Sequence, residues 1–445
     1  MSKYSLLAGA VLSLFAATNI AHAAVSADEA AKLKTTLTPV GAERAGNKEG
    51  TIPAWTGGVA QRPRKDGEAF PADLFPDEKP LFSITAKNMA QYADKLAEGT
   101  KALLQKYPTY RVDVYPTHRT AALPQYYYDR TFRNATTAKL TPENTVDMQP
   151  GGVAFPIPKS GWEVIWNHTL RPKPVAWKYG GTNLVGTSDG RLTLAARFDN
   201  NHDTPNNYPE QTAESWNGDF FLVRFTSTEP SFKTGESILV RDNLRTGRAG
   251  WQYLVGQRRV RRAPTVAYDT PDFVASGANY FDEADGFWGM PDRYEWKLVG
   301  KQELYIPYNT NKFLGAKQEQ GFVPYHTNPD LVRWELHRVW VLDATVAPGK
   351  RHAVPKRRLY IDEDTWGVAI MDGYDAEGKL WRHSQIFPVV IPEVPIIVTE
   401  PSLVYNLQAG GFSFVQDYVG EYLTVVPPRP DSFYTSDSLG AEGVR

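Results

Sequence analysis

The sequence predicts a mainly β protein of the α+β class, built on a large antiparallel sheet. Three observations support this class. The 12 Trp, 23 Tyr and 20 Phe make up 12% of the 445 residues, and aromatic and β-branched side chains favour the half-buried surface of a sheet. The 35 Gly and 33 Pro divide the chain into short runs, as turns between strands require. Several runs also alternate apolar and polar residues over the length of a strand.

The first 24 residues, "MSKYSLLAGAVLSLFAATNIAHAA", have the pattern of a secretory signal peptide. Lys3 precedes an apolar run over residues 6–17, and Ala21-His22-Ala23 forms a small-residue cleavage site, so we expect cleavage after Ala23. The apolar run is shorter than the roughly 20 residues of a membrane span, and no other segment comes as close. We therefore expect a soluble protein in the periplasm of a Gram-negative cell, with secretion as the alternative.

The charge and the cysteine count exclude several classes of protein. The formal net charge is −1, so the protein as a whole does not attract polyanions, and we expect no nucleic-acid partner. No cysteine occurs, so the chain has no disulfide, no thiolate ligand for a metal and no cysteine to carry a lipid anchor.

Helices are expected only in the first quarter of the chain. Ser26 and Glu29 form a capping-box pattern that predicts a short helix at the start of the mature protein. Apolar residues at helical spacing predict a second helix over residues 84–106. The stretch between them is rich in Gly, Pro and charge and predicts extended coil. The predicted divisions are a signal peptide (1–23), a helical and coil extension that packs on the main domain (24–125), the β domain (126–425) and a C-terminal tail (426–445).

Strands are expected from about residue 126 onward. "WNGDFFLVRFTS", "GWQYLVGQRRVRR" and "YEWKLVGKQELYIPYN" each alternate over the length of a strand. Residues 331–387 contain four such segments, which are joined by "APGKRHAVPK", a turn near Asp364 and "DAEG". Parallel neighbours need crossovers of about a dozen residues or more. These four segments therefore predict an antiparallel meander.

Four segments of the chain resemble one family of exported proteobacterial proteins. They are "GAERAGNKEGTIPAWTGG", "WQYLVGQRRVRRAPTVAYDTPDF", "DRYEWKLVGKQELYIPYN" and the run from "NPDLVRWELHRVWVLDATV" to "MDGYDAEGKLWR". Through them the chain resembles the domain-of-unknown-function 1329 family over residues 27–388. That family is similar in fold to the LolA/LolB lipoprotein-carrier superfamily. The resemblance implies a strongly curved antiparallel sheet, a half-barrel, that wraps an apolar cavity closed by helices.

The resemblance also implies a role and partners. A relation to outer-membrane lipoprotein sorting is inferred from the fold alone, and a fold is weak evidence for a function. An inner-membrane efflux-type transporter and an outer-membrane protein are the partners that the resemblance implies. It transfers no catalytic residue.

Motifs for catalysis and metal binding have simpler structural explanations. "GTSDG" fits the G-x-S-x-G pattern around Ser188, but the segment after it alternates as a strand where a nucleophile elbow needs a helix. We expect a hairpin turn and keep a hydrolase that uses Ser188 as the weakest alternative. His337 and His352 could meet across a hairpin, yet the set of ligands that zinc demands is incomplete. "DEDT", residues 362–365, lacks the ligand spacing of a calcium loop and predicts a solvated turn. We expect no catalytic residue, no metal and no cofactor.

The hairpin "GWQYLVGQRRVRRAPTVAYD", residues 250–269, carries the predicted ligand site. With Gly256-Gln257 as a two-residue turn, Trp251 pairs with Arg262. Side chains alternate across a sheet, so one face combines aromatic, aliphatic and cationic groups. We predict that this face lines the cavity and that an apolar chain and its anionic head contact Trp251, Tyr253, Val255, Arg258, Val260 and Arg262. The alternative is that the four arginines of the hairpin form ion pairs with neighbouring strands.

The sequence thus predicts a periplasmic carrier, and not an enzyme, for a hydrophobic ligand such as a lipid or a lipoprotein acyl chain exchanged between the membranes. The helix over residues 84–106 and the loop "GGVAFPIPKSGW", residues 151–162, are the candidate lids. A glycan-binding module is the alternative, because aromatic rings also line sugar sites. A carrier needs an enclosed apolar cavity, whereas a glycan binder exposes its rings in an open groove.

Overall fold

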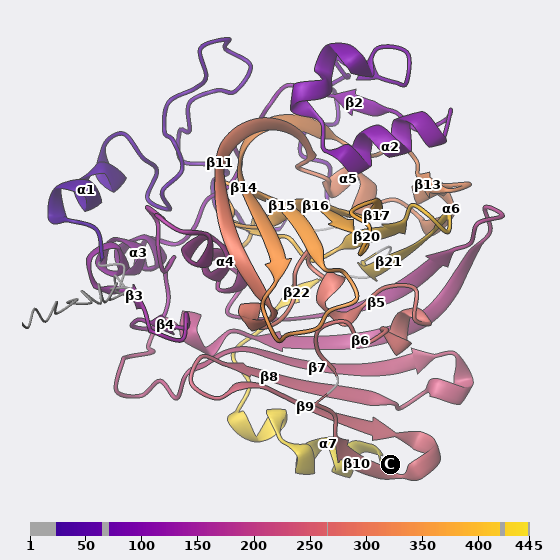
Figure 1. Cartoon of the computed structure of the whole chain (residues 1–445). Helices are drawn as coiled ribbons and strands as arrows, with labels where there is room; N and C mark the ends of the chain where they lie inside the picture. The colour runs from indigo at the N-terminus through magenta and orange to yellow at the C-terminus, as the bar shows by residue number, and fades with distance from the viewer. Residues whose placement is uncertain (1–23, 65–70, 265, 419–422, 444–445) are drawn as a thin grey trace, which may run out of the picture.

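The alternating segments of the sequence pair into one open, mainly antiparallel sheet of 16 strands in a computed structural model of the chain (Figure 1). The structure describes residues 24–64, 71–264, 266–418 and 423–443. The predicted cleavage site after Ala23 lies outside these residues. Among the described helices, none has the length and apolar character needed to cross a membrane.

Two series of hairpins build most of the sheet. The early series runs through β5 (Ala176–Gly186), β6 (Leu192–Asp203), β7 (Asp219–Glu229), β8 (Ser237–Asn243), β9 (Gly247–Leu254) and β10 (Arg259–Arg262). The late series runs through β14 (Trp334–Val346), β15 (Lys356–Asp362), β16 (Val368–Tyr374), β17 (Leu380–Ile386), β20 (Ser402–Asn406) and β21 (Gly411–Asp417). The last strand of the late series, β21, pairs with the first strand of the early series, β5. This pairing joins the two series in the middle of the sheet.

Further strands widen the sheet at β14 and β5. β11 (Tyr294–Pro307) pairs with β14, and β22 (Thr424–Val425) pairs with β5. β1 (Phe82–Ile84) and β2 (Val112–Val114) continue the sheet beyond β14, where Val114 is the parallel partner of Trp334. The N-terminal extension therefore supplies strands as well as coil. Three separate pairs complete the strands: β3 (Lys139–Leu140) with β4 (Val146–Asp147), β12 (Phe322–Val323) with β13 (His326–Thr327), and β18 (Val389–Ile391) with β19 (Ile396–Val398).

Several predictions from local patterns are confirmed. β14 to β17 pair antiparallel in sequence order and form the predicted meander. The first helix, α1 (Ala27–Ala31), has the predicted capping box, in which Ser26 Oγ accepts from Glu29 N and the Glu29 carboxylate accepts from Ser26 N. Turns and helix caps depend on residues that are close in the sequence, so sequence patterns predict them correctly.

The prediction that helices are confined to the first quarter is wrong. The later α-helices are α3 (Gln125–Thr137), α4 (Gly161–Thr169), α5 (Asn311–Leu314), α6 (Gln318–Gly321) and α7 (Ser436–Gly443). α4 is buried on nearly every side, so it shows no polar face to identify it as an amphipathic helix. α3 contains the tyrosines of residues 126–128, and tyrosine favours strands.

The predicted helix over residues 84–106 is interrupted. β1 covers its first residue, a 3-10 helix covers Met89–Lys95, and α2 (Glu98–Lys106) begins only after an extended stretch. The first turn of α2 lies against β16, where Gly99 N donates to Asp372 Oδ1 at 3.2 Å. A Cβ at Gly99 would meet the neighbouring histidine ring at 2.0 Å. This close contact between segments that are distant in the sequence fixes the position where α2 begins.

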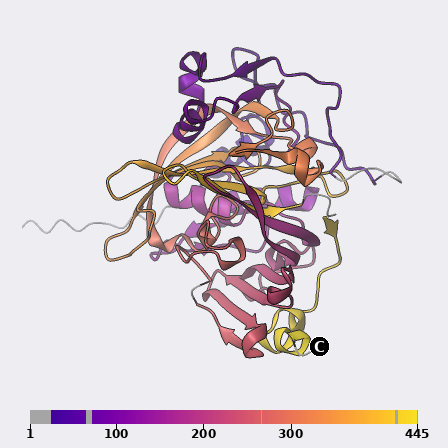
Figure 2. The ribbon, with the colours of Figure 1, turned by 90° about the vertical axis from the view of Figure 1, so that its right-hand side faces the viewer.

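The chain between β10 and β11 covers the concave face of the early strands. The part that we call the covering segment, residues 271–288, has the short 3-10 turns Phe273–Ala275 and Phe281–Glu283 and an isolated β-bridge between Pro271 and Tyr280. Val274 and Phe281 of this segment belong to the main apolar core together with Phe198 and Val223 of the sheet. The opposite face of β8, β9 and β10 contacts α7 (Figure 2). The early strands are therefore covered on both faces.

Buried ion pairs hold the second half of the covering segment to the rest of the protein. Each of its three carboxylates has its own buried arginine: Asp282 with Arg357 (2.8 Å), Glu283 with Arg382 (2.7 and 2.6 Å) and Asp285 with Arg171 (2.9 Å). Removing one member of such a buried pair is costly, because the other charge then has no partner. Residues 282–285 are therefore a fixed anchor.

We expect Arg382→Met to lower the free energy of unfolding by about 3–5 kcal/mol, because it leaves the Glu283 carboxylate buried without a counter-charge. The double variant Arg382→Met/Glu283→Gln removes the stranded charge and should recover most of this loss. Urea unfolding at neutral pH measures both. Equal losses in the single and the double variant would contradict the anchor.

Candidate ligand-binding cavity

A small apolar cavity lies between the concave face of the sheet and the covering segment. Its volume is about 50 Å³. The apolar side chains that line it come from strands and from the covering segment: Phe198, Val223, Phe225, Ile238, Val274, Phe281, Ala284, Trp288 and Val415. A cavity of about 150 Å³ holds one benzene ring. The cavity as it stands is therefore too small for an acyl chain, although its walls have the right chemistry.

Three buried polar atoms of residues that line this cavity have no hydrogen-bond partner among the described residues. They are Asn200 Oδ1 and Gln416 Oε1, which are acceptors, and Trp288 Nε1, which is a donor. Buried polar atoms are usually paired, and leaving one unpaired costs about 1–3 kcal/mol. The cavity thus offers two acceptors and one donor to a ligand that is otherwise apolar.

The backbone at Gln416 places its side chain in the cavity. The pairing of β21 with β5 has a bulge between Phe414 and Asp417, and Gln416 has a φ of 62°. A positive φ is uncommon for a residue other than glycine and accompanies functional positions in many proteins. The Gln416 N–H donates to Asn183 Oδ1 at 2.9 Å, and Asn183 also lines the cavity.

The first half of the covering segment is held less firmly than the second. Asp272 Oδ1 accepts from Val274 N at 2.9 Å, and Asp272 Oδ2 accepts from Asn279 Nδ2 at 3.2 Å. These bonds lie within the segment itself. Burial raises the pKa of Asp272 to about 6, so its ionised form is disfavoured inside the protein. This half, residues 271–279, is the part of the cover that can move without breaking a buried ion pair to the sheet.

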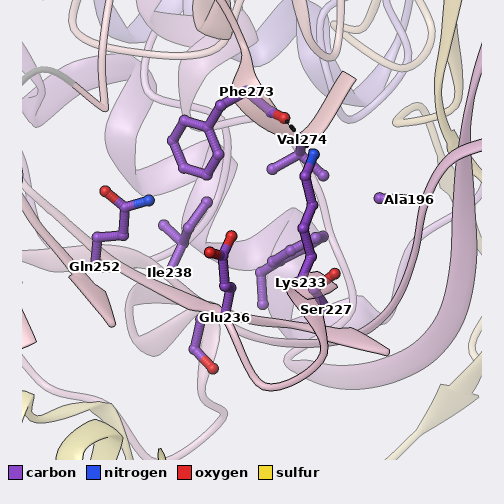
Figure 3. Close-up of a pocket in the computed structure, with 10 residues that line it drawn as sticks. Ala196, Ser227, Lys233, Glu236, Ile238, Gln252, Phe273 and Val274 are labelled. Atoms are coloured by element: carbon purple, nitrogen blue, oxygen red, sulfur yellow. Dashed lines mark hydrogen bonds between the residues drawn. The ribbon is translucent and has the colours of Figure 1, made fainter. Parts of the chain in front are cut away.

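A second hollow of about 10 Å³, which we call the mouth, lies beside the cavity (Figure 3). The mouth and the cavity share Phe225, Ile238 and Val274. Across the mouth, Lys233 Nζ donates to the backbone oxygen of Phe273 at 3.1 Å. This is a direct bond between the β7–β8 loop and the first half of the covering segment.

An exposed apolar and basic surface lies beside this mouth. Phe232, next to Lys233, has 76% of its surface exposed, and Val255 has 37%. The two loops that carry them are neighbours, since a Cβ on Gly235 would lie 3.5 Å from Val255 Cγ2. The four arginines of the adjacent hairpin are also exposed: Arg258, Arg259, Arg261 and Arg262.

The structure confirms the predicted register of that hairpin and corrects its turn. Trp251 pairs with Arg262, and Tyr253 pairs with Val260. The loop has four residues, 255–258, and Arg258 takes the left-handed conformation with a φ of 48°. The prediction of a two-residue turn with glycine in its first position is therefore wrong.

The hairpin face chosen from the sequence lies away from the cavity. Trp251, Tyr253 and Val260 pack in a separate apolar cluster against the C-terminal residues Tyr434 and Leu439. Gln252, on the opposite face, lines the mouth of the cavity. Val255 and Arg258 lie in the exposed loop, and Arg262 lines an open groove. Binding of a ligand by the six residues of the predicted site stays a prediction.

The alternative for the arginines is wrong within the described part of the chain. None of the four forms an ion pair with a described carboxylate. Arg259, Arg261 and Arg262 extend from β10, the last strand in the order of the described sheet, and Arg258 lies in the loop before it. Their charges face solvent.

The motifs weighed for chemistry also have definite places. Ser188 lies exposed in the turn between two strands, β5 and β6, which agrees with the predicted hairpin and does not provide the strand-to-helix elbow. His337 and His352 do not meet, because His352 Nε2 bonds to Asp282 Oδ2 at 2.9 Å. Residues 362–365 are buried, so the prediction of a solvated turn is wrong.

An open groove lies outside the sheet near Arg262. It has a volume of about 490 Å³, and Arg245, Arg248, Tyr268 and Asp292 also line it. The Tyr268 hydroxyl donates to Asp292 Oδ1 at 2.7 Å. An open polar groove with an aromatic ring is the geometry that a glycan site requires.

Sequence reasoning missed the cavity because its wall comes from five strands and an irregular segment. The signal that was present is "NYFDEADGFWG", residues 279–289, where two aromatic pairs flank three carboxylates. In a neutral chain such a run suggests acids that meet buried arginines, with the aromatic rings turned into the core. Asn200 and Gln416 carry no such signal.

Comparisons with known proteins bear on the whole chain. The sequence profile of the family described as "Protein of unknown function (DUF1329)" matches residues 83–440. An uncharacterised protein of Pseudomonas aeruginosa, PA3922, is 40% identical over 455 residues, which cover 99% of each chain.

Two solved structures are similar at low identity. A putative outer membrane lipoprotein-sorting protein domain from Vibrio parahaemolyticus is 13% identical, covers 63% of this chain and 98% of that one, and has a TM-score of 0.44. The LolA superfamily protein NE2245 from Nitrosomonas europaea is 13% identical, covers 63% and 100%, and has a TM-score of 0.36. Both TM-scores lie below 0.5, so we draw no conclusion about function from either likeness. The proposed function is argued from the geometry of the cavity.

We expect Asp272→Asn to change how stability depends on pH. The folded-state pKa of about 6 lies above the ordinary value of 3.8, so protonation favours the folded state and wild-type stability falls as pH rises from about 4 to 6. The full difference is about 3 kcal/mol. In denaturant titrations at several pH values, the variant should lack this loss. Parallel pH profiles for the two proteins would show that Asp272 titrates normally.

Proposed function

The chain belongs to the DUF1329 family, and from this premise we propose that it is a non-enzymatic carrier that holds a hydrophobic ligand, such as a lipid or a lipoprotein acyl chain, on the concave face of its sheet. The observation that supports this function best is the apolar cavity between the sheet and the covering segment, with its three unpaired polar atoms. We place the protein in the periplasm, where such a ligand is exchanged between the membranes.

Binding in this cavity requires the first half of the covering segment to move. A chain of roughly ten buried methylene groups gains about 8 kcal/mol from leaving water. Part of this energy offsets the displacement of residues 271–279, which carry Phe273 and Val274. The second half stays in place because Arg171, Arg357 and Arg382 hold its carboxylates. The lid is therefore this half-segment and neither of the two lids expected from the sequence. Residues 151–162 are mostly buried, and Asn134 Nδ2 donates to Gly151 O at 2.8 Å.

The unpaired atoms favour a ligand with a polar group that both donates and accepts. Asn200 Oδ1 and Gln416 Oε1 need donors, and Trp288 Nε1 needs an acceptor. A hydroxyl or an amide supplies both. A ligand with such a group next to an apolar chain can form hydrogen bonds to these atoms while its chain is buried in the cavity.

The surface beside the mouth suits loading from a membrane. Phe232 inserts readily into the interface of a bilayer because it is apolar and almost fully exposed. The exposed arginines of the hairpin attract anionic head groups. This surface brings the mouth of the cavity to the lipid without a membrane-spanning segment.

The test compares a variant that fills the cavity with one that enlarges the hairpin face. Ala284 lines the cavity, and Val260 packs toward α7. Overpacking costs about 1–3 kcal/mol, so we expect Ala284→Leu to weaken binding of a fluorescent fatty acid roughly tenfold. Val260→Leu adds one methylene group on the other face and should leave binding unchanged. Circular dichroism checks that both variants are folded.

Three outcomes are informative. Loss of binding in Val260→Leu alone would move the site to the hairpin face that the sequence suggested. Equal binding in both variants would contradict a cavity site. Wild-type protein that binds no fatty acid or phospholipid, but binds an oligosaccharide, would transfer the function to the open groove lined by Tyr268 and Arg262, which is the second candidate.

A further inference from the structure

A histidine and two aspartates meet in the interior, far along the chain from the cavity residues. His337 lies on β14, and Asp362 and Asp364 lie where β15 turns toward β16. All three are buried, with at most 5% of their surface exposed. One nitrogen of His337 and one oxygen of each carboxylate all lie within 4.8 Å of one another.

His337 is oriented by a carboxylate on its other side. Its Nε2 bonds to Glu335 Oε2 at 3.1 Å. Glu335 is in turn held by Asn309 Nδ2 at 2.9 Å and by Arg333 Nε. Histidines that bind metals usually use one nitrogen for the metal and the other for a carboxylate or a carbonyl. Here the remaining nitrogen, Nδ1, points to Asp362.

The contact between His337 and Asp362 is too long for a hydrogen bond. His337 Nδ1 and Asp362 Oδ1 are 3.8 Å apart, and within the described part of the chain Asp362 Oδ1 has no hydrogen-bond partner. Another buried pair in the same protein shows what direct contact looks like, because His383 Nδ1 and Asp372 Oδ1 are 2.7 Å apart. The wider spacing leaves room for a shared ion between the two ligand atoms.

The protein fixes the second oxygen of Asp362 and both oxygens of Asp364. Asp362 Oδ2 accepts from Thr365 N at 2.9 Å and from Thr365 Oγ1 at 2.7 Å. The Asp364 carboxylate accepts from Arg119 Nε at 2.8 Å and from Arg119 Nη2 at 2.6 Å. The carboxylates are thus already oriented, as ligands of a metal are.

A buried tyrosine adds a second sign of a ligand. The Tyr308 ring stacks on the His337 ring with centroids 3.9 Å apart. The Tyr308 hydroxyl is buried and has no hydrogen-bond partner among the described residues. Because the Tyr308 ring lies on the His337 ring, this hydroxyl is a candidate donor to the same ion.

We propose that His337 Nδ1, Asp362 Oδ1 and Asp364 form a binding site for one divalent transition-metal ion, with the Tyr308 hydroxyl as a fourth donor. Ligands about 2.1 Å from a tetrahedral zinc ion lie roughly 3.4 Å from one another. The His337–Asp362 distance of 3.8 Å exceeds this by about 0.4 Å. A pair of ligand atoms at the 4.8 Å limit would have to close by about 1.4 Å on binding.

The mixed ligand set selects the class of ion. One imidazole with two carboxylates suits Zn²⁺, Mn²⁺ or Fe²⁺, whereas Mg²⁺ and Ca²⁺ prefer oxygen ligands alone. A bound ion also ties Arg119, from the N-terminal extension, to the sheet through Asp364.

The direct experiment measures metal binding by the full chain. Protein stripped with a chelator is titrated with Zn²⁺ by calorimetry and with Co²⁺ by visible absorption, and thermal unfolding is followed with and without Zn²⁺. We expect about one equivalent of ion, a Co²⁺ spectrum with nitrogen and oxygen ligation, and a rise in Tm. Mg²⁺ at the same concentration should give no rise.

Two isosteric variants make the test specific. Asp362→Asn removes one ligand, and we expect it to weaken Zn²⁺ binding at least roughly 100-fold, more than the loss typical of an outer-shell partner. Asp372→Asn alters the directly bonded His383 pair, so it is the matched control and should bind Zn²⁺ as the wild type does. Folded wild-type protein that binds neither Zn²⁺ nor Co²⁺ would overturn the proposal, and so would equal binding by wild type and Asp362→Asn. Should Asp362→Asn fail to fold, the wild-type titrations still decide.

Discussion

The pairing of β21 with β5 is the contact on which the rest of the structure depends. It sets Phe412 opposite Gly186 and joins the two series of hairpins into one sheet. The bulge in the same pairing turns Gln416 out of the ladder and into the cavity. One long-range contact therefore creates the continuous concave face and also supplies part of its polar chemistry. Without it, the early strands have no late strands to complete their wall.

A continuous concave face creates a second requirement, which is that its apolar side chains be covered. The covering segment meets it in two unequal halves. Residues 282–285 place three carboxylates on three buried arginines, and such pairs favour one geometry over all others because a stranded charge is costly. Besides the bonds within them, residues 271–279 accept from Lys233 Nζ at Phe273 O and from Arg382 Nη2 at Ala278 O, both at 3.1 Å. A firm anchor next to a lightly held half is the arrangement that a lid needs.

The sequence was informative where neighbours in the chain decide the structure. The meander, the capping box at Ser26 and the register from Trp251 to Arg262 depend on residues that are close together in the chain, and all three are confirmed. Contacts between distant segments decided the rest. α4 is hidden from sequence patterns because nearly all of it is buried, and residues 362–365 are buried because Arg119 reaches them from the extension.

The choice of hairpin face shows the same limit. Alternation correctly separates Tyr253 from Gln252, but it cannot say which face turns toward the cavity. The answer depends on α7, whose Leu439 covers the Tyr253 face, and on the covering segment, whose Phe273 covers the Gln252 face. Both covers come from parts of the chain that carry no strand pattern. The sequence also gives no sign of the polar atoms of the cavity, because Asn200 and Gln416 come together only in the folded sheet.

Hydrogen–deuterium exchange of the protein with and without palmitate tests the central claim most directly, which is that the ligand enters beneath the first half of the covering segment. We predict that palmitate changes exchange in residues 271–279 and in the facing strands β6 to β8, while residues 282–285 stay slow in both states. A change confined to α7 and the β9–β10 hairpin would contradict this claim, because it would place the ligand on the opposite face of the sheet.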